Sequence, residues 1–380
     1  MNKRILFFLF FTISGVLSAQ SEQGPFVEKN SFTPKNKQKL FFRVQNQNIF
    51  KNNEYFNLIE PGYTIFGSQA NFTIKYYPSS NTFIEGGIHL LYYYGRDKLD
   101  RVLPIFRFQY TPVKGLQIIF GSIYGGMNHQ YSEPLYRFER VIESPPETGL
   151  QFIYQNNRIH SDLFINWQNY LLRNNYTDQE QFTLGYTGNF KILKPHHRFQ
   201  LDIPLQFIST HRGSQSDTLN LPAVTLMNLA IGSRLSYHIP GFFKEIGVNV
   251  NFMFYNDLSP VKEQAFTQGN GIFPEVFAKS KWINLHIGYW KARDFIAPLG
   301  EPLFSSISYI DENIVFPERQ MLNIKIDLHH IIADGIFIGG RFESYYDILG
   351  NINKEKQPHN DFSYGVYINF NHDFFLKKVK

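Results

Sequence analysis

Residues 361–376 read DFSYGVYINFNHDFFL, and this stretch decides the fold class. Apolar side chains occupy alternate positions, and polar or small side chains occupy the positions between them. The apolar set is Phe362, Tyr364, Val366, Ile368, Phe370 and Phe374, and the other set is Ser363, Gly365, Tyr367, Asn369, Asn371 and Asp373. A period of two residues is that of a β-strand whose faces meet different surroundings, whereas a helix repeats every ~3.6 residues.

The same alternation recurs along most of the chain, for example at 199–207 and 246–255. Many of these runs match the ~9 to 11 residues that a tilted strand needs to cross a bilayer, and they exceed the ~5 to 6 residues of an average strand. The chain is 17% aromatic, yet its mean hydropathy is only −0.28. Because every second residue of a barrel wall faces lipid, the sequence predicts an all-β, transmembrane antiparallel up-and-down β-barrel.

The alternation alone marks fifteen strands, but bacterial single-chain barrels have an even number, with short turns at the periplasmic end. Short connections must alternate with long ones, so we expect a sixteenth strand at 303–310, LFSSISYI, with fourteen strands as the alternative. The extracellular loops are then expected at 125–147, 212–222, 257–280 and 347–360. The fifteen strands are expected at 37–46, 62–77, 82–95, 101–111, 115–124, 148–156, 158–171, 179–193, 197–211, 223–239, 245–256, 281–292, 319–331, 335–346 and 361–376.

The first residues have the features of a secretory signal peptide. Lys3 and Arg4 precede an apolar run at 5–17, and Ser18 and Ala19 provide small residues for cleavage. We therefore expect the protein in the outer membrane of a Gram-negative cell. The expected parts are a signal peptide at 1–19, a short periplasmic tail at 20–36 and the barrel at 37–377.

The charge balance and the cysteine count restrict the partners. With 37 Lys and Arg against 32 Asp and Glu, the net charge is +5, and the basic residues are scattered, so no nucleic-acid partner is expected. The chain has no cysteine, which excludes disulfides and thiolate metal sites. The expected partners are outer-membrane lipid, the barrel-assembly machinery and small solutes, and the composition allows a homo-oligomer.

Sequence motifs of hydrolases, metalloenzymes and nucleotide-binding enzymes are absent. The chain contains no Gly-x-Ser-x-Gly, no His-Glu-x-x-His and no Gly-Lys phosphate loop. A His-x-Ser spacing, which would place both groups on one strand face, is also missing; His129 and Ser132 come nearest, within a loop. Adjacent histidines such as His329 and His330 point to opposite strand faces. We therefore expect no enzyme, no metal site and no cofactor, with a lipid hydrolase as an alternative.

Charges of both signs fall on the polar parity of the strands. They are expected to line the lumen, where they either set the permeability of a pore or pair with one another in a closed barrel. About 16 strands enclose a lumen too wide for side chains alone to fill, which favours the pore. The candidate lumen residues are Glu85, His89, Arg107, Arg234, Lys325, Asp327, Arg341 and Glu343.

The segment 125–147, GGMNHQYSEPLYRFERVIESPPE, is the third expected extracellular loop. It combines charged residues with aromatic residues and prolines that can give it a fixed shape, although a surface flap is the alternative. Its candidate site residues are Glu133, Arg137, Glu139, Arg140, Glu143 and Glu147.

With a signal peptide, sixteen strands, short turns, no plug domain and a charged third loop, the chain resembles the general class of outer-membrane porins. The resemblance implies that the third loop folds into the barrel and narrows the pore. The chain departs from this class at its end, where Leu376 and a basic tail follow the aromatic residues. We expect a channel for passive uptake of small hydrophilic solutes. The alternatives are the lipid hydrolase and a sealed barrel that carries apolar ligands or serves as a subunit of a surface complex.

Overall fold

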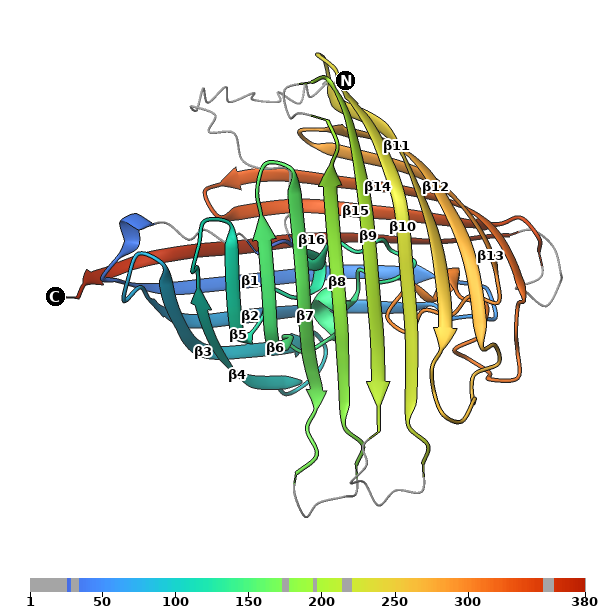
Figure 1. Cartoon of the computed structure of the whole chain (residues 1–380), viewed down its shortest axis with the longest axis horizontal. Helices are drawn as coiled ribbons and strands as arrows, with labels where there is room; N and C mark the ends of the chain where they lie inside the picture. Colours follow the sequence, from blue (N-terminus) through green and yellow to red (C-terminus); the bar gives the residue numbers. More distant parts are fainter. Residues whose placement is uncertain are drawn as a thin grey trace, which may run out of the picture.

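A computed structural model describes residues 26–28, 34–172, 178–193, 197–213, 221–350 and 359–379. Within these residues, sixteen antiparallel strands follow one another around a closed barrel, and β16 pairs with β1. In Figure 1 the green and yellow strands β6 to β13 form the near wall, and the blue and red strands cross behind them. The predicted fold class and the count of sixteen are confirmed.

The strands are longer than those of an average soluble sheet, as a bilayer requires. Their bounds are β1 (Lys39–Glu54), β2 (Tyr63–Tyr76), β3 (Thr82–Tyr93), β4 (Arg101–Tyr110), β5 (Leu116–Ser122), β6 (Thr148–Gln155), β7 (Ile159–Asn169), β8 (Gln181–Lys191), β9 (Phe199–Arg212), β10 (Val224–His238), β11 (Phe243–Asp257), β12 (Gln268–Ser280), β13 (Ile283–Arg293), β14 (Glu318–Ala333), β15 (Ile336–Asp347) and β16 (His359–Lys378).

The two faces of the wall have opposite chemistry. On the outside, Val366 is 60% exposed and Phe106 is 50% exposed, whereas the inward Glu343 and Ser363 are fully buried. Closure leaves no unpaired strand edge. A closed barrel with an apolar exterior belongs in an outer membrane. Among the described residues, no helix is long and apolar enough to span a membrane.

The position of the sixteenth strand corrects the prediction. The missing strand is β12, inside the segment expected to be an extracellular loop at 257–280, and 303–310 is not a strand. In β12, Pro274 and two glycines interrupt the pattern, and Phe273 and Phe277 make its inward face apolar as well. The segment 303–310 is apolar for another reason, because its first residues pack inside the barrel.

Short and long connections alternate around the barrel as expected. Tight turns at one end, such as 156–158 and 334–335, contrast with long loops at the other end. The short-turn end also carries the start of β1 and the end of β16, which makes it the periplasmic end.

Two long loops fold into the lumen rather than over it. The β5–β6 loop at 123–147 contains two short helices, η2 (Gly126–His129) and α1 (Arg140–Glu143), and the β13–β14 loop at 294–317 contains η3 (Pro302–Phe304). Their backbones meet where Arg137 N donates to Leu299 O at 2.8 Å and Glu301 N donates to Glu133 O at 3.0 Å.

The apolar core lies inside the barrel, around the second of these loops. Phe304 is fully buried, and its ring makes edge contacts with Phe273, Trp290 and Tyr345. The indole of Trp290 also donates to Phe304 O at 3.0 Å. The loop therefore fills the lumen as part of the core.

The described residues 26–28, within the segment expected to be a periplasmic tail, also lie against lumen side chains. The ring of Phe26 packs edge-on against Phe138 and Tyr367, at centroid distances of 4.9 and 4.5 Å. Glu28 lies 2.6 Å from Arg43 and 2.8 Å from Arg107. Residues 26–28 therefore occupy part of the lumen.

Candidate functional site

The structure places the candidate strand residues on the inner wall, where nearly all of them have ionic or hydrogen-bonding partners. Arg107 pairs with Glu85 at 3.1 Å, and Arg234 pairs with Glu245 at 2.7 Å. Arg341 lies 2.8 Å from Glu343. The inward-facing candidates are Glu85, His89, Arg107, Arg234, Lys325, Asp327, Arg341 and Glu343.

The third long loop is tied to this wall by its acidic residues. Glu133 lies 3.0 Å from both Lys325 and Arg341. Glu139 pairs with Lys51 of β1, which also lies 3.1 Å from Glu343. The four other groups are almost completely buried, and the Lys325 and Arg341 side chains are only 15% and 10% exposed, so the pairs fix the loop across the lumen instead of lining an open pore.

A different arrangement occurs at the long-loop end, around Glu60 of the β1–β2 connection. Oε1 of Glu60 lies 3.3 Å from Arg137, which also binds Glu143 at 2.6 Å. The Arg137 side chain is 26% exposed, and that of Glu60 is 12% exposed. Burial raises the pKa of Glu60 to about 7; Arg137 opposes this rise, and the nearby Glu139 and Glu143 add to it.

Hydrogen bonds hold Glu60 in place. Oδ1 of Asn57 accepts the backbone N–H of Glu60 at 3.0 Å, and the loop at 294–317 clamps the same connection where Tyr309 N donates to Ile59 O at 2.7 Å. Oε2 of Glu60 has no hydrogen-bond partner among the described residues. One carboxylate oxygen is therefore free to accept a proton or a hydrogen bond.

Other buried polar atoms around this end also lack partners within the described part of the chain. Native proteins satisfy most such atoms, so a group of exceptions marks a site where water or a ligand belongs. They are Nδ2 and Oδ1 of Asn53, the hydroxyls of Tyr55 and Tyr345, Oε2 of Glu139, both amide atoms of Asn323 and Oδ2 of Asp347.

His129 is locked between two carboxylates. Its Nδ1 lies 2.7 Å from Asp162 of β7, and its Nε2 lies 3.1 Å from Glu147. Burial lowers the pKa of His129, but Glu147 and Asp162 together raise it to about 9. Ser132 bonds instead to Gln206, at 3.0 Å, so the structure does not show a Ser132–His129 pair.

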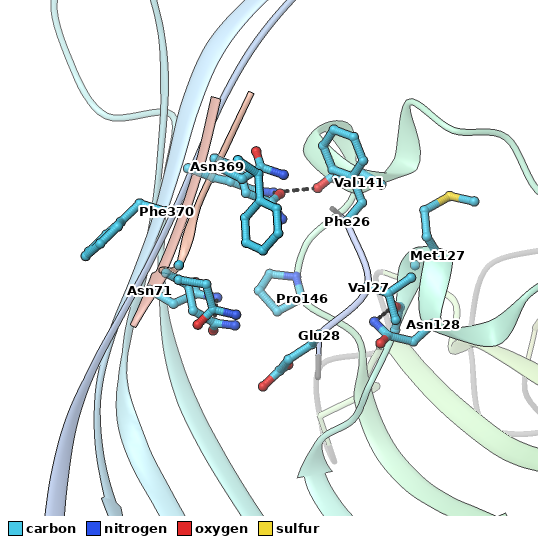
Figure 2. A pocket seen from close by; sticks show the side chains of 18 of the residues that line it. Phe26, Val27, Glu28, Asn71, Met127, Asn128, Val141, Pro146, Asn369 and Phe370 are labelled. Atoms are coloured by element: carbon cyan, nitrogen blue, oxygen red, sulfur yellow. Dashed lines mark hydrogen bonds between the residues drawn. The ribbon is translucent and has the colours of Figure 1, made fainter. Parts of the chain in front are cut away.

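A cavity of about 710 Å³ lies on the periplasmic side of the β5–β6 loop. Figure 2 shows Asn71, Asn369 and Phe26 directed into it and Phe370 directed away, with Met127 and Asn128 on the opposite side. The Arg140 and Glu147 candidates line it as well, and so do Lys281 and Gly335 at the short-turn end. The cavity is a vestibule between the loop and the periplasmic opening.

His89 is the one predicted site residue with a free acceptor in this vestibule, as far as the described residues show. Its Nδ1 lies 2.8 Å from Oδ1 of Asn71, so Nδ1 carries the hydrogen and Nε2 is an acceptor. Nε2 is buried and has no hydrogen-bond partner. Neutral carboxamides surround it, including Gln45 and Gln69.

A smaller cavity of about 280 Å³ lies beside residues 130–133 of the loop, lined by Arg234, Glu275, His286 and Lys325. The loop therefore separates two spaces in the lumen. Among the described residues, no group of three or more His, Asp or Glu side chains could hold a metal ion.

Several residues of these clusters were not among the predicted site residues. Lys51 lies beyond the predicted end of the first strand, and Glu60 and Glu301 lie in connections without a regular pattern. Glu28 lies in the expected tail. Inward parity would have identified Lys51 if the strand had been extended, but no sequence signal places the other three in the lumen.

The sequence profile of a family described as "Lipid A 3'-O-deacylase-type" matches residues 32–379. This family is one of enzymes, so the expectation of no enzyme is wrong. Motifs missed it because the groups that meet in a barrel come from distant strands and loops, with no fixed spacing. No curated protein matches the chain.

Solved outer-membrane proteins have similar folds. OprD from Pseudomonas aeruginosa is 7% identical, with a TM-score of 0.49, and the match covers 89% of this chain and 95% of that one. OmpT from Vibrio cholerae, in a trimer form, is 10% identical with a TM-score of 0.46, and the match covers 88% and 99% of the two chains. Identities this low say nothing about function.

Proposed function

Because the chain belongs to the lipid A 3'-O-deacylase-type family, we propose that it removes an ester-linked acyl chain from lipid A in the outer membrane. The match over residues 32–379 carries this proposal, since it spans all sixteen strands and both lumen loops. The filled lumen supports it, because a barrel occupied by paired charges is built to hold side chains in place.

The site that best fits the reaction is the Glu60–Arg137 pair at the long-loop end. A carboxylate with a pKa of about 7 is poised for general-base catalysis at neutral pH. Glu60 takes a proton from water while the water oxygen attacks the ester carbonyl, and the guanidinium of Arg137 stabilises the resulting oxyanion. Collapse of the intermediate breaks the bond to the sugar oxygen, which receives the proton, and the fatty acid is released.

The test is mass spectrometry of lipid A from cells that express the protein. The wild-type chain should reduce the mass of lipid A by one acyl group, and Glu60→Gln should abolish this change. Glu312→Gln, an exposed position on the loop at 294–317, serves as the matched control and should remain active. Unchanged lipid A in cells with folded wild-type protein would refute the proposal, whereas an active Glu60→Gln would refute only the role of Glu60.

A second candidate is passage of small hydrophilic solutes, favoured by the 710 Å³ vestibule with its carboxamide lining. The loops at 123–147 and 294–317 occupy this route, so passage requires them to move. In planar bilayers, deletion of 127–145 should raise the conductance. A deletion variant that inserts but conducts no better than the wild type would rule this candidate out.

A further inference from the structure

The outer face of β1 and β2 carries polar side chains where the wall should be apolar. Asn46 and Asn48 of β1 and Ser68 of β2 form a patch, which we name the amide patch. Nδ2 of Asn46 donates to Oγ of Ser68 at 3.1 Å, and Nδ2 of Asn48 donates to Oδ1 of Asn46 at 2.5 Å.

The parity of β1 shows that this patch faces lipid. Gln45 and Gln47 line the vestibule, and Lys51 is buried inside the barrel, so the even-numbered residues of this part of β1, Asn46 and Asn48 among them, point outward. In agreement, Phe50 of the same parity packs on Phe66, which is 49% exposed on the outer surface.

The depth of the patch excludes a headgroup position. Asn46 and Asn48 lie near the middle of β1 (Lys39–Glu54), and the outward residues Val44 and Phe50 flank them on either side. On the neighbouring β16, Ile368 pairs with Asn48 and is 48% exposed. The patch therefore lies within the band that meets hydrocarbon.

Acyl chains offer no hydrogen bonds at this depth, so lipid cannot complete the bonding of the amides. Each amide oxygen can accept two hydrogen bonds. Among the described residues, Oδ1 of Asn46 accepts one from Asn48, and Oδ1 of Asn48 accepts one from the Tyr94 hydroxyl at 3.3 Å. The patch keeps acceptor capacity that only another protein surface can use inside the membrane.

We propose that the amide patch is the centre of an interface with a second copy of this chain, related by a two-fold axis along the membrane normal. The patch is uncharged. Its amide hydrogens are used within the wall, since Nδ2 of Asn46 also donates to Gln69 O at 3.1 Å and Nδ2 of Asn48 also donates to Ile368 O at 3.5 Å. The Ser68 hydroxyl of one copy can therefore donate to an amide oxygen of the other copy, and a two-fold axis repeats this bond in the opposite direction. Ala70, which pairs with Asn46, is small and allows the two walls to approach closely. This interface is independent of the proposed activity.

The chain contains no cysteine, so single cysteines give a direct test. Ser68→Cys should form a disulfide-linked dimer in isolated outer membranes under mild oxidation. Ser233→Cys is the matched control, since Ser233 is an exposed outward serine of β10, across the barrel. Equal cross-linking of both variants would indicate random collision and would overturn the proposal, as would a Ser68→Cys adduct with a different protein.

A second measurement does not depend on cross-linking. Native mass spectrometry in mild detergent should give a dimer for the wild type and a monomer for the Asn46→Leu/Asn48→Leu variant. Heat-modifiable mobility in gels should show that this variant is still a folded barrel, and its monomers should be at least as heat-resistant. A wild-type monomer, or a variant that remains a dimer, would overturn the proposal.

Discussion

His129 and Asp162 form one of the contacts that join the third long loop to the barrel wall, with 2.7 Å between Nδ1 and Oδ2. Both residues are fully buried, and the imidazole ring stacks on Phe164 with 3.6 Å between centroids. Because Glu147 holds the other nitrogen, two carboxylates share one imidazolium cation at this point.

His129→Leu should release the loop, because it leaves Asp162 and Glu147 as unpaired buried charges. Breaking a buried ion pair costs about 3 to 5 kcal/mol, so opening of the loop should become at least ~100-fold more frequent. Limited proteolysis within 130–146, in detergent-solubilised protein, measures this opening. His160→Leu is the control. His160 lies on the same strand as Asp162 but bonds only weakly to the loop, at 3.3 Å from Gln130, so the cleavage rate should stay unchanged.

The same contact should weaken at alkaline pH. The pKa of His129 rises from 6.5 to about 9 in the folded protein, so its stabilising contribution is complete below pH 6.5 and is lost as the pH rises through 9. The pKa of Glu147 falls from 4.5 to about 2, so its contribution is already complete above pH 4.5. Proteolysis of the loop should therefore accelerate between pH 6.5 and 9.5. Because His129→Leu has no imidazole, an equal acceleration in that variant would contradict the assignment.

Phe304→Ala should undock the loop at 294–317. Removal of a buried phenylalanine costs about 3 to 5 kcal/mol, and this ring contacts Phe273, Trp290 and Tyr345. Trp290 is fully buried in the native protein, so its fluorescence emission should shift to longer wavelength. Phe252→Ala, at a lipid-facing position that is 50% exposed, should leave the emission as it is. An unshifted spectrum for Phe304→Ala would show that the loop stays docked without the ring.

If Glu60 is the general base, deacylation should rise as the pH increases through about 7, where its carboxyl group loses its proton. Glu60→Asp should keep part of the activity with the same direction of pH dependence. A rate that is independent of pH between 5 and 8 in the wild type would argue against Glu60 as the base. The assay is the release of fatty acid from purified lipid A in mixed micelles.

The sequence predicted the strands best where the two faces differ most, as in β16 and β11. The sequence placed the end of the first strand at residue 46, because the outward Asn46 and Asn48 remove the alternation there. As a result, Lys51 was not predicted to lie on the inner face. The apolar Phe273 and Phe277 on the inner face hid β12 in the same way. In these cases one strand face carried a side chain of the wrong polarity for its side of the wall.

The alternation of the strands predicts which candidate side chains face the lumen, but it does not predict which group each of them pairs with. Lys325 and Arg341 were expected on the inner wall, and they are there. Their common partner Glu133 lies far away in sequence, in a loop whose path depends on tertiary contacts. The position of Glu60 depends on a second loop that packs on it, which no local pattern encodes.

The bonds between the two lumen loops, Arg137 N to Leu299 O and Glu301 N to Glu133 O, have a mechanical consequence. They connect the β5–β6 side of the wall to the β13–β14 side through the interior. A wide barrel under the lateral pressure of a bilayer can flatten by shearing its strand ladders. Here, flattening must also compress or stretch the two bonded loops that cross the interior. The loops thus make the cross-section of the barrel rigid.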